Sequence, residues 1–154
     1  MEYRIATEDD IEVLTASRMT VLKAANQLDD AADMTHVEAA SREYYQKALA
    51  EDTHLAILVM DRGKLIGTGG VSFFQVMPTY HNPSGKKAYI MNMYTDPAYR
   101  RQGIALKTLD MLVKAAKERG ITQITLEATD MGRPLYEKYG FVQMKSEMEL
   151  QKPD

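Results

Sequence analysis

A strand, a short loop and a long amphipathic helix are predicted by residues 88–120, which read AYIMNMYTDPAYRRQGIALKTLDMLVKAAKERG. Gly103 stands where the helix should begin, and Gly120 stands where it should end. The first turn of a helix exposes N–H groups without intrahelical acceptors, and the helix dipole makes that end partly positive. Gly103 lets an anion approach these amides, and Arg100 and Arg101 add two cations. The stretch therefore predicts a phosphate site, which we expect to hold a diphosphate.

Two common phosphate-binding motifs do not fit this loop. A P-loop requires Lys-Ser/Thr after its second glycine, and the dinucleotide fingerprint requires three glycines, whereas residues 100–105 read RRQGIA. An enzyme that uses nucleoside triphosphates would also need a phosphate-binding lysine and metal-binding acids, which this pattern lacks. The loop therefore belongs to another type of phosphate site.

Length and composition favour a single domain. The chain has 154 residues, enough to bury roughly two thirds of its unfolded surface, and we expect residues 1–154 to form one domain. No apolar run approaches the ~20 residues that span a bilayer, and the acidic N-terminus does not resemble a secretory signal. The absence of cysteine excludes disulfides, thiolate metal sites and a cysteine nucleophile, and it fits a reducing compartment. We therefore expect a cytoplasmic protein that has no membrane partner.

Charge is distributed unevenly along the chain. Residues 1–52 contain 5 Lys/Arg and 12 Asp/Glu, whereas residues 53–154 contain 14 and 10. Most of these side chains are expected on a solvated surface, but the asymmetry also fits an acidic part facing a cationic acceptor and a basic part receiving an anionic cofactor. Asp29, Asp30 and Asp33 lie in a polar break and are candidates for attracting that acceptor. The net charge of −3 and the lack of a basic stripe disfavour nucleic-acid binding.

The chain as a whole predicts a mixed α/β fold. We expect strands at 3–6, 54–60, 65–74, 89–95 and 121–128, helices at 8–27, 35–51, 103–119 and 131–139, and one or two final strands within 141–150. A helix joins the strands at 89–95 and 121–128, so these two should be parallel, whereas the earlier strands form an antiparallel half. The three glycines in the strand at 65–74 predict close backbone packing or a bulge, since no helix follows them.

Two motifs resemble those of one enzyme family. The hexad RRQGIA at 100–105 is similar to the acetyl-CoA pyrophosphate motif, Gln/Arg-x-x-Gly-x-Gly/Ala, of the Gcn5-related N-acetyltransferase (GNAT) superfamily. Residues 126–141, LEATDMGRPLYEKYGF, resemble the second cofactor-side motif and follow the hexad at the expected distance. The resemblance covers residues 54–150, whereas residues 1–53 match the variable part of the superfamily only as two helices after a strand.

The resemblance implies a GNAT-type fold that uses acetyl-CoA and no metal. In this superfamily the central strand and the following parallel strand splay apart, and the pantetheine arm pairs with the central strand. The matching positions are Met93 and Thr95, with Tyr94 between them. The pyrophosphate would lie on a loop and first helical turn formed by Arg100, Arg101, Gln102, Gly103, Ile104, Ala105 and Leu106. The acceptor amine would attack the thioester directly, without an acyl-enzyme.

The resemblance also implies a catalytic acid. Tyr136 matches the tyrosine that often protonates the departing CoA thiolate, and a phenol with an ordinary pKa near 10 can donate at neutral pH. The alternative is a half-buried tyrosine that packs on the sheet, which is the role we expect for Tyr139. Thr129 departs from the pattern, because many members carry asparagine there to hold the cofactor arm and threonine has a shorter reach.

The general base and the acceptor pocket are left open by the sequence. Glu127, Asp130 or water leading to bulk could accept the amine proton, and Tyr94 and Tyr80 are candidates for lining the acceptor pocket. The histidines share no metal-ligand spacing, and we expect each at the surface or with satisfied hydrogen bonds: His36, His54 and His81.

These observations together predict an acetyl-CoA-dependent N-acetyltransferase that acts on a primary amine. The acceptor could be a polyamine, an amino-sugar antibiotic, an amino acid or a protein amine. The alternative is a non-catalytic module that senses acyl-CoA or contacts a protein, and cofactor binding without turnover would favour it. A homodimer is also left open, since short exposed strands are expected near the C-terminus.

Overall fold

The computed structural model describes residues 1–153, which form a five-stranded sheet with helices packed against it. The strands lie across the sheet in the order β1-β2-β3-β4-β5; β1 to β4 are antiparallel neighbours, and β5 is parallel to β4. The mixed α/β fold expected from the sequence is confirmed. The bounds are β1 Glu2–Ile5, η1 Glu8–Asp10, α1 Ile11–Ala25, α2 Thr35–Ala50, β2 His54–Asp61, β3 Lys64–Gln75, β4 Lys86–Thr95, η2 Pro97–Tyr99, α3 Ile104–Glu118, β5 Gln123–Leu126 and α4 Arg133–Tyr139.

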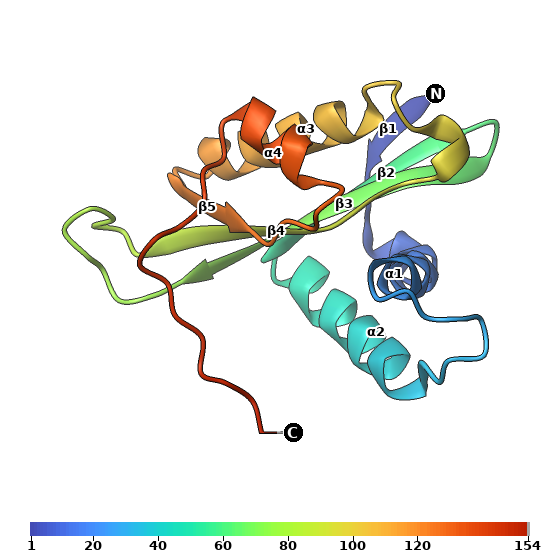
Figure 1. Cartoon of the computed structure of the whole chain (residues 1–154), viewed down its shortest axis with the longest axis horizontal. Coiled ribbons are helices and arrows are strands. Elements are labelled where there is room, and N and C mark those ends of the chain that lie inside the picture. The colour runs from blue at the N-terminus through green and yellow to red at the C-terminus, as the bar shows by residue number, and fades with distance from the viewer. Residues whose placement is uncertain (154) are drawn as a thin grey trace.

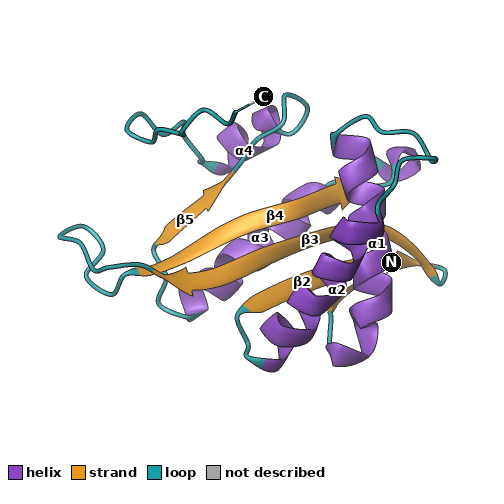
Figure 2. Cartoon of the chain, turned by 90° about the horizontal axis from the view of Figure 1, so that it is seen from below, coloured by secondary structure: helices purple, strands orange, loops and turns teal. Residues whose placement is uncertain are grey.

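Helices cover both faces of the sheet, with α3 and α4 on one side and α1 and α2 on the other (Figure 1). The larger apolar cluster lies between α3 and the sheet, where Leu109 and Leu112 are fully buried. The smaller cluster joins Leu14 of α1 and Tyr45 of α2 to Leu58 of β2. On this second face the two helices lie over one end of the strands and leave β5 uncovered (Figure 2).

The helix α3 begins and ends at the two glycines that the sequence indicated. Gly103 is its N-cap residue with φ +79°, and Gly120 follows its C-cap residue with φ +77°. Both values lie in the left-handed region, where a side chain is strained and glycine is not. The buried face of the helix is formed by Ile104, Thr108, Leu109, Leu112, Val113 and Ala116.

β3 and β4 form a bulge where they approach α3. A Cβ atom on Gly69 would lie 2.7 Å from the Met93 sulfur and 2.8 Å from Cγ2 of Thr108, so any larger residue would displace these side chains. The register between the strands shifts between Thr68 and Gly70, where β4 contains one extra residue, and Asn92 adopts φ +60°. Close packing and a bulge, the two alternatives predicted by the glycine pattern, are therefore both present.

The C-terminal part differs from the sequence-based prediction. β5 spans only Gln123–Leu126, and residues 141–153 form neither a strand nor a helix, so the prediction of a final strand is wrong. Apolar residues of this segment become a strand only where a neighbouring edge pairs with them. Within residues 1–153 no strand pairs with the outer edge of β5, and the side chains of Val142 and Met148 are 85% and 96% exposed.

A capping box formed by Thr7 and Asp10 lies between β1 and α1. Oδ2 of Asp10 accepts a hydrogen bond from the backbone N–H of Thr7 at 2.8 Å. The Arg4 guanidinium donates to both carboxylate oxygens of Asp10, at 2.7 and 3.0 Å. These hydrogen bonds, that of Arg4 first, hold the pKa of the Asp10 carboxyl below its ordinary 3.8.

Replacing Asp10 with asparagine should lower the free energy of unfolding at neutral pH by about 1–2 kcal/mol, the range of helix-cap losses. A lowered pKa means that the charged carboxyl stabilises the fold above its unfolded pKa, and that this stability is lost as the pH falls through the folded pKa. The difference in unfolding free energy between the parent protein and Asp10→Asn should therefore be largest near neutral pH and disappear in acid. Urea unfolding over this pH range measures it.

The matched control for this prediction is Asp9→Asn, which removes the same charge from an exposed side chain that accepts no hydrogen bond among residues 1–153. Asp9→Asn should change the unfolding free energy little at any pH. Equal losses in the two variants, or a loss in Asp10→Asn that persists in acid, would contradict the role given to Asp10.

Candidate active site

The first turn of α3 presents backbone amides that have no acceptor. The amide of Lys107 donates to the carbonyl of Gly103 at 3.1 Å, but the amides of residues 101–106 find no partner within the described chain. Arg101 and Gly103 have φ values of +64° and +79°. Left-handed residues in such loops turn N–H groups toward a common concavity that binds anions. This end of α3 is therefore suited to a phosphate group.

The side chains around these amides divide between core and solvent. Ile104 is 2% exposed and anchors the helix start in the larger apolar cluster, and Ala105 is half-buried. No carboxylate in the described part of the chain pairs with the guanidinium of Arg100 or Arg101, so both charges are available to an anion. The exposed side chains of the loop and first turn are those of Arg100, Arg101, Gln102 and Leu106.

The second feature of the site is an opening in the sheet. β4 and β5 pair over four residues and diverge after the Ile90–Leu126 pair, although β4 continues to Thr95 (Figure 2). The amide of Asp96 donates to the carbonyl of Ile66, on the β3 side. Because peptide groups alternate in direction along a strand, those of Met93 and Thr95 point toward the opening. An extended ligand chain could pair with them there.

The side chains at this end of β4 pack within the protein. Met93 packs in the larger apolar cluster, against the space that a Cβ of Gly69 would need. Tyr94 and Thr95 are half-buried and lie opposite Thr68 and Gly67 in the register. What these residues offer a ligand is therefore their main chain.

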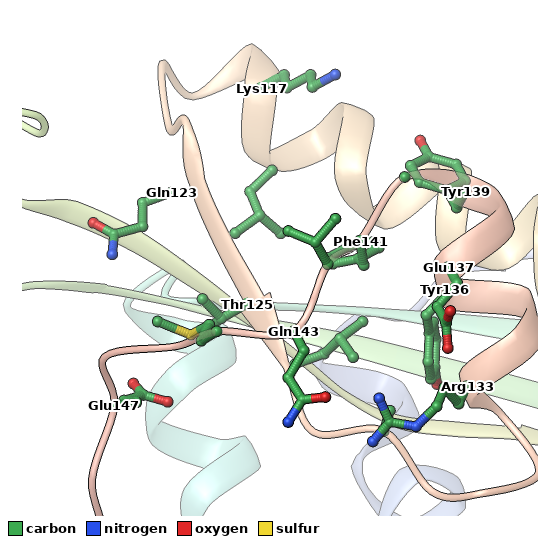
Figure 3. A pocket seen from close by; sticks show the side chains of 16 residues that line it. Lys117, Gln123, Thr125, Arg133, Tyr136, Glu137, Tyr139, Phe141, Gln143 and Glu147 are labelled. Carbon is green, nitrogen blue, oxygen red and sulfur yellow. The ribbon is translucent and has the colours of Figure 1, made fainter.

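Tyr136 lies on the buried side of α4, with 8% of its surface exposed. Its ring packs edge-on against Phe141, with centroids 6.2 Å apart, and its hydroxyl makes no hydrogen bond within residues 1–153. Burial raises the pKa of the phenol, which is therefore protonated at neutral pH. Figure 3 shows Tyr136 beside Arg133 at a cavity of about 730 Å³ that also borders β5 and the segment after α4.

Two neighbours of Tyr136 have structural hydrogen bonds. Oγ1 of Thr129 accepts a hydrogen bond from the amide of Gly132 at 3.1 Å, which closes the turn before α4. The Tyr139 hydroxyl donates to Oδ1 of Asp110 at 2.8 Å and ties α4 to α3. Burial, together with this hydrogen bond, raises the pKa of Tyr139 to about 12. The packing role expected for Tyr139 is confirmed, and the Thr129 oxygen is partly engaged by the protein itself.

The candidate bases stand at the end of β5. Glu127 and Asp130 are both exposed. The pKa of the Tyr89 phenol on β4 is raised, first by burial and then by the nearby charge of Glu127. Tyr80, a candidate for the acceptor pocket, is 92% exposed on the loop that projects beyond the sheet (Figure 1). The structure therefore does not bring Tyr80 to the site.

A polar cluster that the sequence did not predict lies between the sheet and the helices α1 and α2. His54 is 5% exposed, and its Nδ1 lies 2.9 Å from the Tyr44 hydroxyl and 3.2 Å from the Ser72 hydroxyl. Its Nε2 is buried without a partner among the described residues, so the expectation of a satisfied or surface histidine fails at this nitrogen. Nearby, Arg18 donates to Oδ1 of Asn92 at 3.1 Å. These residues come from separate elements, so no local motif could indicate them.

The other two histidines, His36 and His81, are exposed as expected. Within residues 1–153 no three His, Cys, Asp or Glu side chains are grouped in a way that could hold a metal ion. None of the helices in that range is both long enough and apolar enough to cross a bilayer.

Comparison with known proteins extends the likeness beyond the two motifs. The profile described as "Acetyltransferase (GNAT) family" matches residues 22–141. A structure described as a predicted acetyltransferase with acetyl-CoA, from Clostridium acetobutylicum, is 36% identical and gives a TM-score of 0.89 over 97% of this chain and 95% of that one. A GCN5-related N-acetyltransferase from Ralstonia eutropha JMP134 is 27% identical, with a TM-score of 0.84 over 99% and 97% of the two chains.

A curated relative points in the same direction. The "Probable glucosamine 6-phosphate N-acetyltransferase 2" of Oryza sativa subsp. japonica is 28% identical over 81% of this chain and 75% of that protein. The free amides before α3, the opening between β4 and β5 and the match over most of the sequence agree with one another. The chain belongs to the GNAT family of acetyltransferases and is an N-acetyltransferase.

Proposed function

We propose that this chain transfers an acetyl group from acetyl-CoA directly to a primary amine, and that residues 1–154 form a single catalytic domain. The observation that carries the proposal is that two sets of free backbone groups occur in one structure. They are the amides of residues 101–106 and the peptide groups of Met93 and Thr95 at the open edge of β4. A diphosphate on the first set and an extended amide-containing arm along the second suit a single CoA molecule. The acetyl-CoA in the similar Clostridium structure supports the same cosubstrate.

The residues would divide the binding of acetyl-CoA between them. The amides of the α3 start, with Arg100 and Arg101, would hold the pyrophosphate, and the peptide groups of Met93 and Thr95 would pair with the pantetheine arm. The hydroxyl of Thr129 keeps a proton that it could donate to the same arm, since its oxygen accepts from Gly132. When bound, acetyl-CoA supplies a thioester carbonyl that an amine can attack.

Side chains of the protein would donate and accept the protons of the transfer reaction. The acceptor nitrogen bonds to the carbonyl carbon while the C–S bond breaks, and no acyl-enzyme is needed in a chain without cysteine. Tyr136 donates its phenolic proton to the leaving sulfur and regains one from solvent; its raised pKa keeps the proton in place until the sulfur becomes anionic. The proton of the amine passes to Glu127, to Asp130 or to water.

Replacing Tyr136 with phenylalanine should lower kcat by roughly 10²–10⁴-fold, the range for removing a general acid, while the affinity for acetyl-CoA is retained. Thiol release at saturating acetyl-CoA measures kcat, and calorimetry measures the affinity. Tyr139→Phe is the matched control, because within residues 1–153 the hydroxyl that it removes is hydrogen-bonded only to Asp110. The control should keep its kcat and lose about 1 kcal/mol of stability. Full activity of Tyr136→Phe across the pH range would remove Tyr136 from the role of acid.

The double replacement Arg100→Gln and Arg101→Gln should raise the KM for acetyl-CoA about tenfold at low salt, because charge-assisted bonds to the diphosphate are lost. The effect should shrink as salt screens the remaining attraction. Lys47→Gln with Lys114→Gln removes the same charge from exposed side chains of α2 and α3 that do not border the cavity beside Tyr136. If this control weakens acetyl-CoA binding equally, the two arginines act only through net charge.

The acceptor is proposed to be a small molecule with a cationic amine, drawn by the loop between α1 and α2. Asp29 accepts a hydrogen bond from the amide of Ala31, and Asp33 from the amide and hydroxyl of Thr35, so asparagine can preserve these turns. Asp30 borders a surface hollow of about 940 Å³. The name of the rice relative makes amino sugars the first compounds to test. A cytoplasmic location and a homodimer stay predictions.

Replacing Asp29, Asp30 and Asp33 together by asparagine should raise the acceptor KM about three- to tenfold and leave the acetyl-CoA KM unchanged, because the field that concentrates a cation is weakened. Steady-state kinetics with the best substrate among glucosamine 6-phosphate, glucosamine, polyamines and amino acids measures this. A control with three carboxylates neutralised elsewhere, at Glu8, Asp9 and Glu51, should leave the acceptor KM unaltered. An unchanged acceptor KM in the loop variant would end the idea.

A further inference from the structure

A small cavity of about 230 Å³ lies between α1, α2 and the sheet, on the face opposite α3. Its lining combines polar side chains with the apolar surfaces of Ala40, Tyr45 and Met91. The polar lining comes from Arg18 on α1, Tyr44 on α2, His54 on β2, Ser72 on β3 and Asn92 on β4. None of these side chains has a part in the proposed binding of acetyl-CoA.

Arg18 brings an uncompensated positive charge to this cavity. It is half-buried, and its one hydrogen bond within residues 1–153 goes to the neutral amide oxygen of Asn92. Three other arginines of the described chain, Arg4, Arg42 and Arg119, each pair with a carboxylate. A half-buried guanidinium without a carboxylate partner keeps donors free at the cavity, and these donors and its charge suit an anion.

The second donor in the cavity is a hydroxyl oriented by His54. Burial and, to a smaller degree, Arg18 lower the pKa of His54 to about 4, so its ring carries a single proton at neutral pH. We assign that proton to Nδ1, because Nε2 is buried without a partner and a buried N–H without an acceptor is rare. Nδ1, the Tyr44 hydroxyl and the Ser72 hydroxyl then carry one proton each. The Nδ1 proton is donated to the hydroxyls, and one hydroxyl proton makes the hydrogen bond between Tyr44 and Ser72. One O–H is left to donate into the cavity.

The position of the cavity sets the size of the molecule that could reach it. Asn92 occupies the bulge of β4 opposite Gly69, at the start of the strand segment that leaves β5. Ser72 lies three residues along β3 from Gly69, about 10 Å at the usual rise of a strand. An acceptor whose amine reaches the opening and whose other end reaches Ser72 and Arg18 must therefore be compact.

We propose that this cavity binds an anionic group, a carboxylate or a phosphate, of the amine acceptor, through Arg18, the amide of Asn92 and the Tyr44–Ser72 hydroxyl pair. His54 is a positioning residue that orients the hydroxyls. The inference rests on the proposed function for its link to catalysis, and it narrows the acceptor to a compact molecule with both an amine and an anion. Such a molecule also offers the cationic amine that the acidic loop would attract.

The test is a titration of the protein saturated with CoA, which fills the amides at the start of α3. Inorganic phosphate and acetate are the probes, added at constant ionic strength while the imidazole NMR signals are followed. The exposed His36 and His81 serve as internal references for the buried His54. We expect a saturable shift of the His54 signal with at least one probe, and a Kd at least tenfold higher in Arg18→Gln. Tyr44→Phe should weaken binding severalfold, since it removes only the hydroxyl.

Lys47→Gln is the matched control, because it removes a positive charge from the exposed side of α2 and should leave the Kd unchanged. Intact CoA binding and unshifted reference histidines show that each variant is folded. Saturation by phosphate alone identifies a phosphate-bearing acceptor, and saturation by acetate alone a carboxylate. No saturable shift with either probe, or an unchanged Kd in Arg18→Gln, would overturn the proposal.

A kinetic experiment tests whether the cavity takes part in acetyl transfer. Thiol release is compared for 2-aminoethyl phosphate against ethanolamine and for β-alanine against β-alaninamide. One anionic member should have a KM at least tenfold lower than its neutral partner, and Arg18→Gln should abolish that preference. A preference that survives in Arg18→Gln would contradict the assignment. If no amine is acetylated, it is the proposed function that fails, and the titration still decides whether the cavity holds an anion.

Discussion

The parting of β5 from β4 after the Ile90–Leu126 pair is the constraint on which the site depends. Elsewhere in the sheet β4 has a neighbour on both sides, and its peptide groups are satisfied. Beyond that pair the groups of Met93 and Thr95 face an opening, which costs the sheet the ladder hydrogen bonds that β5 would otherwise supply. A ligand that carries its own amides completes the ladder and removes this cost. The unpartnered amides before α3 follow the same logic at the other end of the ligand.

The bulge in β4 connects the two faces of the site. On the α3 side, Gly69 leaves room for Met93 to pack against the helix, which fixes how the extra residue is accommodated. On the other side, Asn92 takes a left-handed backbone conformation, which asparagine adopts more readily than other residues with a side chain. The hydrogen bond from Arg18 to the Asn92 side chain helps to hold that conformation. The charge of Arg18, which we propose receives an anion, is thus hydrogen-bonded to the strand that would hold the thioester arm.

The features that the sequence predicted are those with local signals. Gly103 and Gly120 mark the ends of α3 because a single glycine is enough to favour a left-handed backbone conformation. The apolar face of α3 follows from the spacing of its apolar residues alone. The final strand was predicted wrongly because pairing depends on a distant edge, and β5 offers no partner to residues 141–153. The cluster around His54 escaped prediction for a related reason. Its hydrogen bonds join Tyr44 to Ser72 across 28 positions, and Arg18 reaches Asn92 across 74.

A division of labour between main chain and side chains explains why the cosubstrate is easier to infer than the acceptor. The diphosphate and the pantetheine arm would be held chiefly by peptide groups, which any sequence with this fold and a glycine at the start of α3 can present. The acceptor would be met by side chains on α1, α2 and the facing strands. α1 and α2 pack on the sheet through the smaller apolar cluster, which does not include Arg18 or Tyr44. These positions can therefore change, and with them the acceptor, while the larger core and the thioester site are left intact.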